Sequence, residues 1–184
     1  MEKIIKKFID YLLLEKKYSK HTVLAYQKDI ESFGLFISKE FETDDFLEVN
    51  YNLIRSWIVY LSDNGIENTS INRKISSLKS FYKFLLKTKQ IEQSPLSKHK
   101  ALKSPKKVQI PFSQKELDSV LNLLQFPDGF EGVRDKLIID LFYSTGIRRS
   151  ELINLKVQNI DLHSKTIKVI GKRNKERIIP MLEN

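Results

Sequence analysis

The chain has 184 residues and a formal net charge of +9, and 41% of its residues are hydrophobic and 30% charged, which excludes a disordered, low-complexity or collagen-like protein. It contains no cysteine, which excludes a disulfide scaffold, a cysteine-ligated metal site and cysteine nucleophile chemistry. No apolar run approaches the roughly 18 residues of a membrane span, and the lysine-rich start is unlike a signal peptide, so we expect a cytosolic protein that does not enter a membrane.

Residues 1–90 carry the apolar periodicity of four amphipathic helices. Ser19 is placed to cap the second helix, Asn64-Gly65 ends the third, and the fourth begins near Asn68. The short connections predict a compact helical bundle. The positions expected to face its core are Ile4, Ile5, Phe8, Ile9, Leu12, Leu13, Val23, Tyr26, Ile30, Phe33, Ile37, Ile54, Trp57, Ile58, Leu61, Ile71, Ile75, Leu78, Tyr82 and Leu85.

The positive charge is concentrated in residues 68–107, where eleven basic residues stand against a single acid, Glu92, for a net charge of +10. A one-sided field of this kind attracts polyanions such as nucleic acid or an anionic membrane. The face of the fourth helix opposite its expected core mixes cations with Asn and Ser, which suits a helix that contacts DNA phosphates and base edges. A solvated lysine-rich face is the alternative. The lack of any acid in this stripe favours the DNA-facing interpretation.

From residue 91 to 107 the periodicity stops and lysine and proline accumulate, which predicts a basic interdomain linker. Residues 108–184 then form a second domain. Ser113 and Glu116 are spaced as a capping box for a helix that contains Leu117, Val120, Leu121 and Leu124. Two further helices are expected over 134–143 and 147–155, followed by a small antiparallel sheet with alternating apolar residues.

Arg148 is unusual because it stands in the first turn of a predicted helix, where the helix dipole disfavours a cation. Glu151, three residues on, could compensate through a local ion pair, and an external phosphate is the other candidate. The tip of the predicted hairpin, GKRNKER, presents Lys172, Arg173, Lys175 and Arg177 against Glu176. A lysine at such a tip could enter a groove or donate a proton to a leaving oxygen, although basic tips are also common on solvated hairpins.

These segments together resemble a known family. TGIRRSELINL (residues 145–155) and VIGKRNKERIIP (residues 169–180) resemble the first arginine motif and the lysine β-hairpin of tyrosine recombinases, nearest to the Xer and phage-integrase branch. Residues 11–33 and 70–85 resemble the core-binding domain of that family. The resemblance implies a mainly α fold, in which a four-helix SAM-like core-binding domain (1–90) precedes the start of an α+β catalytic domain (108–184).

The resemblance also implies an activity. Tyrosine recombinases cut and rejoin DNA at specific sites through a 3′-phosphotyrosyl intermediate, without metal or cofactor, as homo- or hetero-oligomeric tetramers on double-stranded DNA. Arg148 would stabilise the transition-state charge on the scissile phosphate, Lys172 would protonate the leaving 5′-oxygen, and Glu151 would support Arg148. Arg173 is a departure, because relatives often carry glycine there.

The same resemblance separates DNA contact from catalysis. The side chains expected to contact DNA are Lys20, His21, Thr22, Tyr26, Asn72, Arg73, Lys74, Ser76, Ser77, Lys79, Ser80, Lys83, Arg173 and Lys175. The His-x-x-Arg motif and the nucleophilic tyrosine of the family would follow beyond Asn184. We therefore expect an N-terminal portion of a longer recombinase that binds DNA but does not cut it alone. The alternatives are a non-catalytic DNA-binding regulator, a type IB topoisomerase-like enzyme and a basic membrane-surface module.

Overall fold

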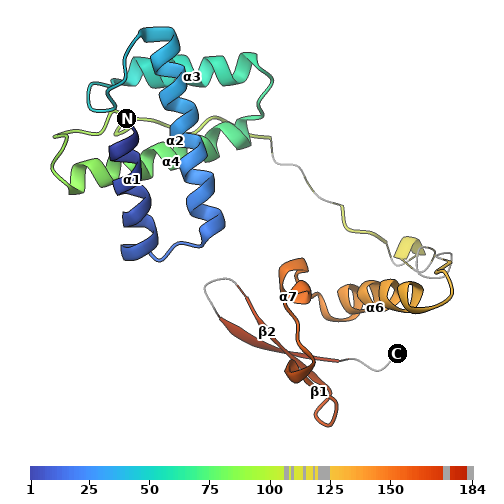
Figure 1. Ribbon diagram of the computed structural model, residues 1–184. Helices are drawn as coiled ribbons and strands as arrows, with labels where there is room; N and C mark the ends of the chain where they lie inside the picture. Colours follow the sequence, from blue (N-terminus) through green and yellow to red (C-terminus); the bar gives the residue numbers. More distant parts are fainter. Residues whose placement is uncertain are drawn as a thin grey trace. The chain divides into compact units, whose positions relative to one another are not determined.

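The computed structural model (Figure 1) describes residues 1–105, 108, 110–113, 115–117, 119, 125–171 and 175–181. Contacts between residues divide the chain into two compact units, Met1–Val108 (unit 1) and Gln109–Asn184 (unit 2). Each unit is described by itself. The architecture is mostly helical with one small antiparallel sheet, which confirms the predicted fold class.

Unit 1 is a bundle of helices whose ends follow local sequence signals. Ser19 Oγ accepts a hydrogen bond from the backbone N–H of Thr22, and Asn50 Oδ1 accepts from Leu53, so both residues cap the helices that follow them. Gly65, just after the third helix, has a φ of 76°, which costs glycine little. The elements are α1 (Glu2–Asp10), the π-helix η1 (Tyr11–Glu15), α2 (Lys20–Phe41), α3 (Tyr51–Asp63) and α4 (Asn68–Lys87).

The core of unit 1 is built from the apolar stripes of these helices. Phe33 on α2 lies against Trp57 on α3, with ring centroids 5.1 Å apart, and Phe8 on α1 meets Phe81 on α4 at 5.2 Å. The Tyr82 hydroxyl donates to the carbonyl of Phe46. Of the twenty positions predicted for this core, sixteen are buried, because the helical period selects one face of each helix. Ile4, Ile9 and Tyr26 are half-buried and pack against the core, whereas Leu13, on the π-helix η1, is exposed.

The segment that follows α4 packs onto unit 1, which the predicted linker did not anticipate. Leu96 is buried in the same core. The backbone N–H and C=O of Leu102 both bond to the side-chain amide of Asn72, at 2.9 Å each, and Lys79 Nζ donates to the carbonyl of His99. Residues 91–104 therefore extend the first unit, although their composition is that of a linker.

Unit 2 begins with the predicted capping box. Ser113 Oγ accepts from the N–H of Glu116, whose carboxylate in turn accepts from the N–H of Ser113. Val120, Leu121 and Leu124, predicted for the helix that follows, lie outside the described residues. The described elements are α6 (Phe130–Thr145), which ends at Gly146 with a φ of 57°, α7 (Arg149–Ile153), the 3-10 helix η2 (Val157–Asn159), β1 (Ile160–Asp161), β2 (Thr166–Ile170) and β3 (Glu176–Pro180).

The three strands form an antiparallel sheet in the order β1-β2-β3. Ile160 pairs with Ile167, and Val169 pairs with Arg177 across the β2–β3 hairpin. Alternate residues of β2 face inward, so that Ile167 and Val169 form a small core with Ile147 and Ile179. This core fixes the register that brings β3 beside the start of α7.

Candidate functional site

The first candidate site forms where α7 begins. Arg148 is the residue immediately before α7, with an extended backbone, instead of lying in the first turn. The carboxylate of Glu151, in the first turn, accepts from the backbone N–H of Arg148 at 2.9 Å and from its Nη1 at 2.8 Å. The three-residue spacing places the carboxylate back over the helix start, as in a capping box. The local Arg148–Glu151 pair that the sequence suggested is therefore present.

A second arginine joins this pair from the sheet. Arg177 on β3 donates from Nη2 to Glu151 Oε2 at 2.7 Å. The Glu151 side chain is 1% exposed, whereas the side chains of Arg148 and Arg177 are 65% and 40% exposed. The backbone N–H of Arg148 first, and then the Arg177 guanidinium, lower the pKa of Glu151 to about 2 against the opposing effect of burial. The carboxylate therefore stays charged and fixes both arginines.

The end of β2 lies against the same cluster. A Cβ atom at Gly171 would lie 3.0 Å from Glu151 Oε1 and 3.7 Å from Arg148 Nη1. The N–H of Gly171 donates to the carbonyl of Lys175 at 2.7 Å, which closes the hairpin, and the Lys175 side chain is exposed. Lys172 and Arg173, predicted at this hairpin, lie outside the described residues.

This arrangement has the chemistry of an anion site. Two guanidinium groups share one carboxylate, which leaves one positive charge in excess. A guanidinium carries five N–H donors, and in this cluster Arg148 uses one side-chain donor on Glu151. The largely exposed Arg148 side chain therefore keeps donors for an anionic group such as a phosphate.

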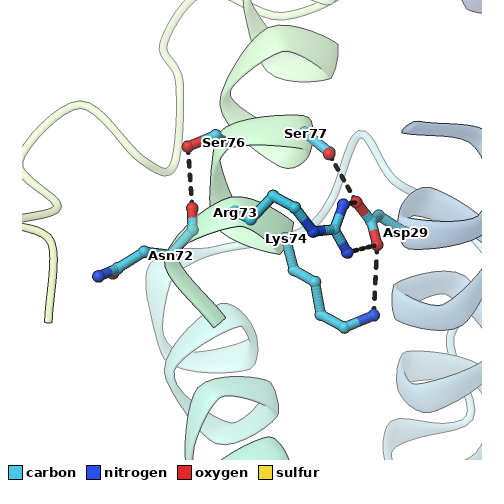
Figure 2. A network of polar contacts seen from close by, with 6 residues as sticks. All are labelled: Asp29, Asn72, Arg73, Lys74, Ser76 and Ser77. Carbon is cyan, nitrogen blue, oxygen red and sulfur yellow. Dashed lines mark hydrogen bonds and ion pairs between the residues drawn. The ribbon is translucent and has the colours of Figure 1, made fainter. Parts of the chain in front are cut away.

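The second candidate site is the basic surface of α4 and the start of α2. Arg73 and Lys74 do not point freely into solvent, because both donate to the carboxylate of Asp29 on α2 (Figure 2). Ser77 also donates to Asp29 and is fully buried. The prediction that Ser77 contacts DNA is therefore wrong: it lies on the side of α4 that packs against α2.

The packed segment 91–104 covers another part of the α4 face. The amide of Asn72 is engaged with Leu102, and its Nδ2 also lies 3.5 Å from Ser104 Oγ. Lys79 is exposed, but its ammonium bonds to the carbonyl of His99. Fewer side chains of the α4 face are therefore available to DNA than the helical period indicated.

The remaining predicted positions on unit 1 are accessible to different degrees. Lys20, His21, Ser76 and Lys83 are exposed, and Thr22, Tyr26 and Ser80 are half-buried. Ser76 Oγ donates to the backbone carbonyl of Asn72, as Figure 2 shows. The Tyr26 ring lies edge-on to Tyr18, with centroids 6.0 Å apart.

Asp29 was not recognised as a site residue from the sequence, and Arg177 was noted only as one of the basic residues of the hairpin tip. Asp29 interrupts an apolar stripe directly before Ile30, and a buried acid in such a stripe calls for a cationic partner. That signal was available, but it did not identify the partner. Within the described residues, no group of three or more His, Asp or Glu side chains is arranged to hold a metal ion. In the same part of the chain, none of the helices is long and apolar enough to cross a membrane.

Comparison with known proteins assigns both parts of the chain. Residues 5–89 match the N-terminal SAM-like domain of phage integrases, and residues 113–184 match the phage integrase family. The chain belongs to the phage integrase family of tyrosine recombinases. It is 38% identical over 183 residues to the tyrosine recombinase XerC of Staphylococcus carnosus and 33% identical over 180 residues to XerC of Bacillus subtilis. Each alignment covers 98% of this chain, and the chain spans about 60% of the length of these relatives.

Solved structures share the fold at lower identity. A lambda integrase (75–356) dimer bound to a COC′ core site superposes with a TM-score of 0.75 at 16% identity, covering 98% of this chain and 59% of the integrase. The Tn1549 transposon integrase in complex with circular intermediate DNA gives a TM-score of 0.70 at 18% identity, covering 97% of this chain and 61% of the integrase. A lambda integrase tetramer bound to a Holliday junction gives 0.72 at 15% identity, covering 100% of this chain and 51% of that one.

Proposed function

We propose that the whole protein to which these residues belong is a site-specific DNA recombinase. The observation that carries the proposal is the Arg148–Glu151–Arg177 cluster, which joins the arginine motif (145–155) to the hairpin motif (169–180) by which the chain resembles its family. Whole-chain similarity to Xer recombinases supports the proposal. In this account Arg148 binds the scissile phosphate, and Lys172 protonates the leaving 5′-oxygen.

Within this proposal, unit 1 supplies much of the DNA affinity. Its exposed cations on α2 and α4 contact backbone phosphates. Integrase structures of the same fold hold DNA, one of them as a tetramer on a Holliday junction, which supports a recombinase oligomer on DNA as the working form. Residues 1–184 alone bind DNA without cleaving it, because none of their tyrosines lies in the motif of the family's nucleophile.

Covalent trapping tests the chemistry. A nicked duplex that carries the recombination site loses a short fragment on cleavage and traps the phosphotyrosyl adduct, which a denaturing gel resolves. We expect an adduct with the whole protein and none with residues 1–184. An adduct with residues 1–184 would overturn the assignment of the nucleophile, and a whole protein that binds DNA but forms no adduct at its site would favour a non-catalytic regulator.

Lys172 has a chemical signature of its own in the same assay. Lys172→Ala in the whole protein should slow adduct formation, because the leaving 5′-oxygen then lacks its proton donor. Replacing that oxygen by sulfur should partly restore the rate, since a thiolate leaves without a proton. An equal defect on both substrates would remove Lys172 from the role of general acid.

A further inference from the structure

The strongest polar network of unit 1 surrounds one buried carboxylate. The Asp29 side chain, on α2, is 3% exposed. It accepts hydrogen bonds from Arg73 Nη1 and Nη2 at 2.6 and 2.9 Å, from Lys74 Nζ at 3.2 Å and from Ser77 Oγ at 2.7 Å. Figure 2 shows these donors converging from α4 on Asp29. The carboxylate is therefore fully engaged.

The network leaves positive charge at the surface. Two cations, Arg73 and Lys74, face one anion, so one positive charge is in excess. The Lys74 side chain is only 20% exposed, whereas that of Arg73 is 51% exposed. Arg73 is therefore the member through which the network meets solvent.

The geometry at Arg73 also leaves donors available. Two of the five N–H groups of the Arg73 guanidinium are directed at Asp29, one from each terminal nitrogen, and among the described residues the other three have no hydrogen-bond acceptor. The bidentate contact fixes the plane of the group. A guanidinium fixed in this way loses less conformational freedom when it binds a further anion than a mobile side chain loses.

We propose that Asp29 is a positioning residue that holds the Arg73 guanidinium in the orientation in which it binds a DNA phosphate. This inference rests on the proposed function, because it assumes that unit 1 contacts DNA. It assigns a role to an acidic residue in a surface where acids should otherwise weaken DNA binding. Asp29 touches no DNA itself and acts through Arg73.

The direction in which Asp29→Asn changes the DNA affinity distinguishes a positioning role from a purely electrostatic one. Asp29→Asn removes a negative charge close to the DNA-binding surface, so charge alone predicts tighter binding. Loss of positioning predicts weaker binding. We expect Asp29→Asn to weaken the affinity of residues 1–184 for a 30-base-pair duplex about tenfold, the size of one lost ordered contact.

A double-mutant cycle locates the effect. In an Arg73→Ala background, Asp29→Asn should cause no further weakening, because the residue that it positions is gone. Glu15→Gln is the matched control: it removes the same charge from the exposed Glu15–Lys87 pair, which joins η1 to the end of α4. This control should bind DNA at least as tightly as the unmodified chain.

The outcomes separate the inference from the function on which it rests. Circular dichroism verifies that Asp29→Asn is folded. The positioning role is wrong if this variant binds DNA at least as tightly as the unmodified chain. It is also wrong if Asp29→Asn lowers the DNA affinity of the Arg73→Ala variant by the same factor as that of the unmodified chain. If Asp29→Asn does not fold, Arg73→Lys tests the inference instead, because lysine keeps the positive charge but cannot form the bidentate contact with Asp29. A loss of DNA affinity comparable to that of Arg73→Ala supports the positioning role. An unchanged affinity overturns it. If the unmodified chain binds no duplex, the proposed function of unit 1 fails instead.

Discussion

Two buried carboxylates, Asp29 and Glu151, organise the two candidate sites in the same way. Each accepts hydrogen bonds from two basic side chains and leaves one positive charge in excess. A buried carboxylate without these partners would be strongly destabilising, so each site depends on all of its members. The cations at these sites are therefore held in place by ion pairs to buried carboxylates.

Glu151 should make the stability of unit 2 depend on pH. Its pKa of about 2 in the folded state lies below its ordinary value of 4.5, so the unfolded state binds the proton first. The stabilisation is present above pH 4.5 and is lost as the pH falls towards 2. Hydrogen-exchange protection of the β2 and β3 amides should therefore decrease over this range and decrease less in Glu151→Gln. Identical pH profiles for the two proteins would show that Glu151 contributes nothing.

The sequence predicted the contact between residues that are close along the chain and missed the contacts between residues that are far apart. Arg148 and Glu151 are three residues apart, so the start of one helix brings them together. Arg177 lies 26 residues from Glu151, and Arg73 lies 44 residues from Asp29. Those contacts depend on strand register and on helix packing, which periodicity does not give. Ser77 was misassigned for the same reason, because its buried partner lies on another helix.

At the scale of elements, caps and periods predicted the helices well, and composition misled where the chain is irregular. Ser19, Asn64-Gly65 and the Ser113–Glu116 box act as the sequence indicated. The segment 91–104 has no period, yet hydrogen bonds from Asn68, Asn72 and Lys79 attach it to α4, and Leu96 is buried in the core. Anchors of this kind join residues about 20 to 35 positions apart, so they leave no periodic pattern in a sequence.

Asn72 should be one of the residues that keep the segment 91–104 in place, together with Asn68 and Lys79. Asn72→Ala removes both hydrogen bonds to the backbone of Leu102, so trypsin should cut after Lys100 and Lys103 faster than in the unmodified chain. Mass spectrometry of early digestion products measures these cuts. Ser76→Ala is the control, because Ser76 bonds only to the backbone of its own helix among the contacts described. Equal rates in all three proteins would contradict the anchoring role.

At the scale of the whole molecule, the packed segment moves the C-terminal boundary of unit 1 from residue 90 to residue 108. We expect residues 1–108 to unfold cooperatively at about the same temperature as unit 1 in the longer chain. Residues 1–90 should melt lower, because they lack Leu96, which is buried in the core. Thermal unfolding followed by Trp57 fluorescence measures both fragments. Equal melting temperatures would show that residues 91–108 are a linker only.

The charge of the chain should make its DNA binding strongly dependent on salt. Each phosphate that the protein neutralises releases about 0.9 counterion, so the logarithm of the affinity should fall linearly with the logarithm of the salt concentration. Lys83→Ala should reduce the slope by about 0.9 and weaken all duplexes alike. Lys3→Ala, on α1, removes the same charge from an exposed residue that is not among the predicted DNA contacts, and it should leave the slope unchanged. A titration of a fluorescent duplex between about 50 and 200 mM salt gives these slopes.

The central claim is that Arg148 acts in DNA cleavage, and comparing its effects on rate and on affinity tests it most directly. The pentacoordinate transition state carries more charge on the phosphate oxygens than the ground state, so a fixed guanidinium stabilises it preferentially. In the whole protein, Arg148→Ala should slow formation of the phosphotyrosyl adduct about 10²- to 10³-fold, while the equilibrium affinity for DNA, spread over many cations, changes little. Cleavage at the normal rate, or a loss of activity only in proportion to lost binding, would show that Arg148 is merely the structural partner of Glu151.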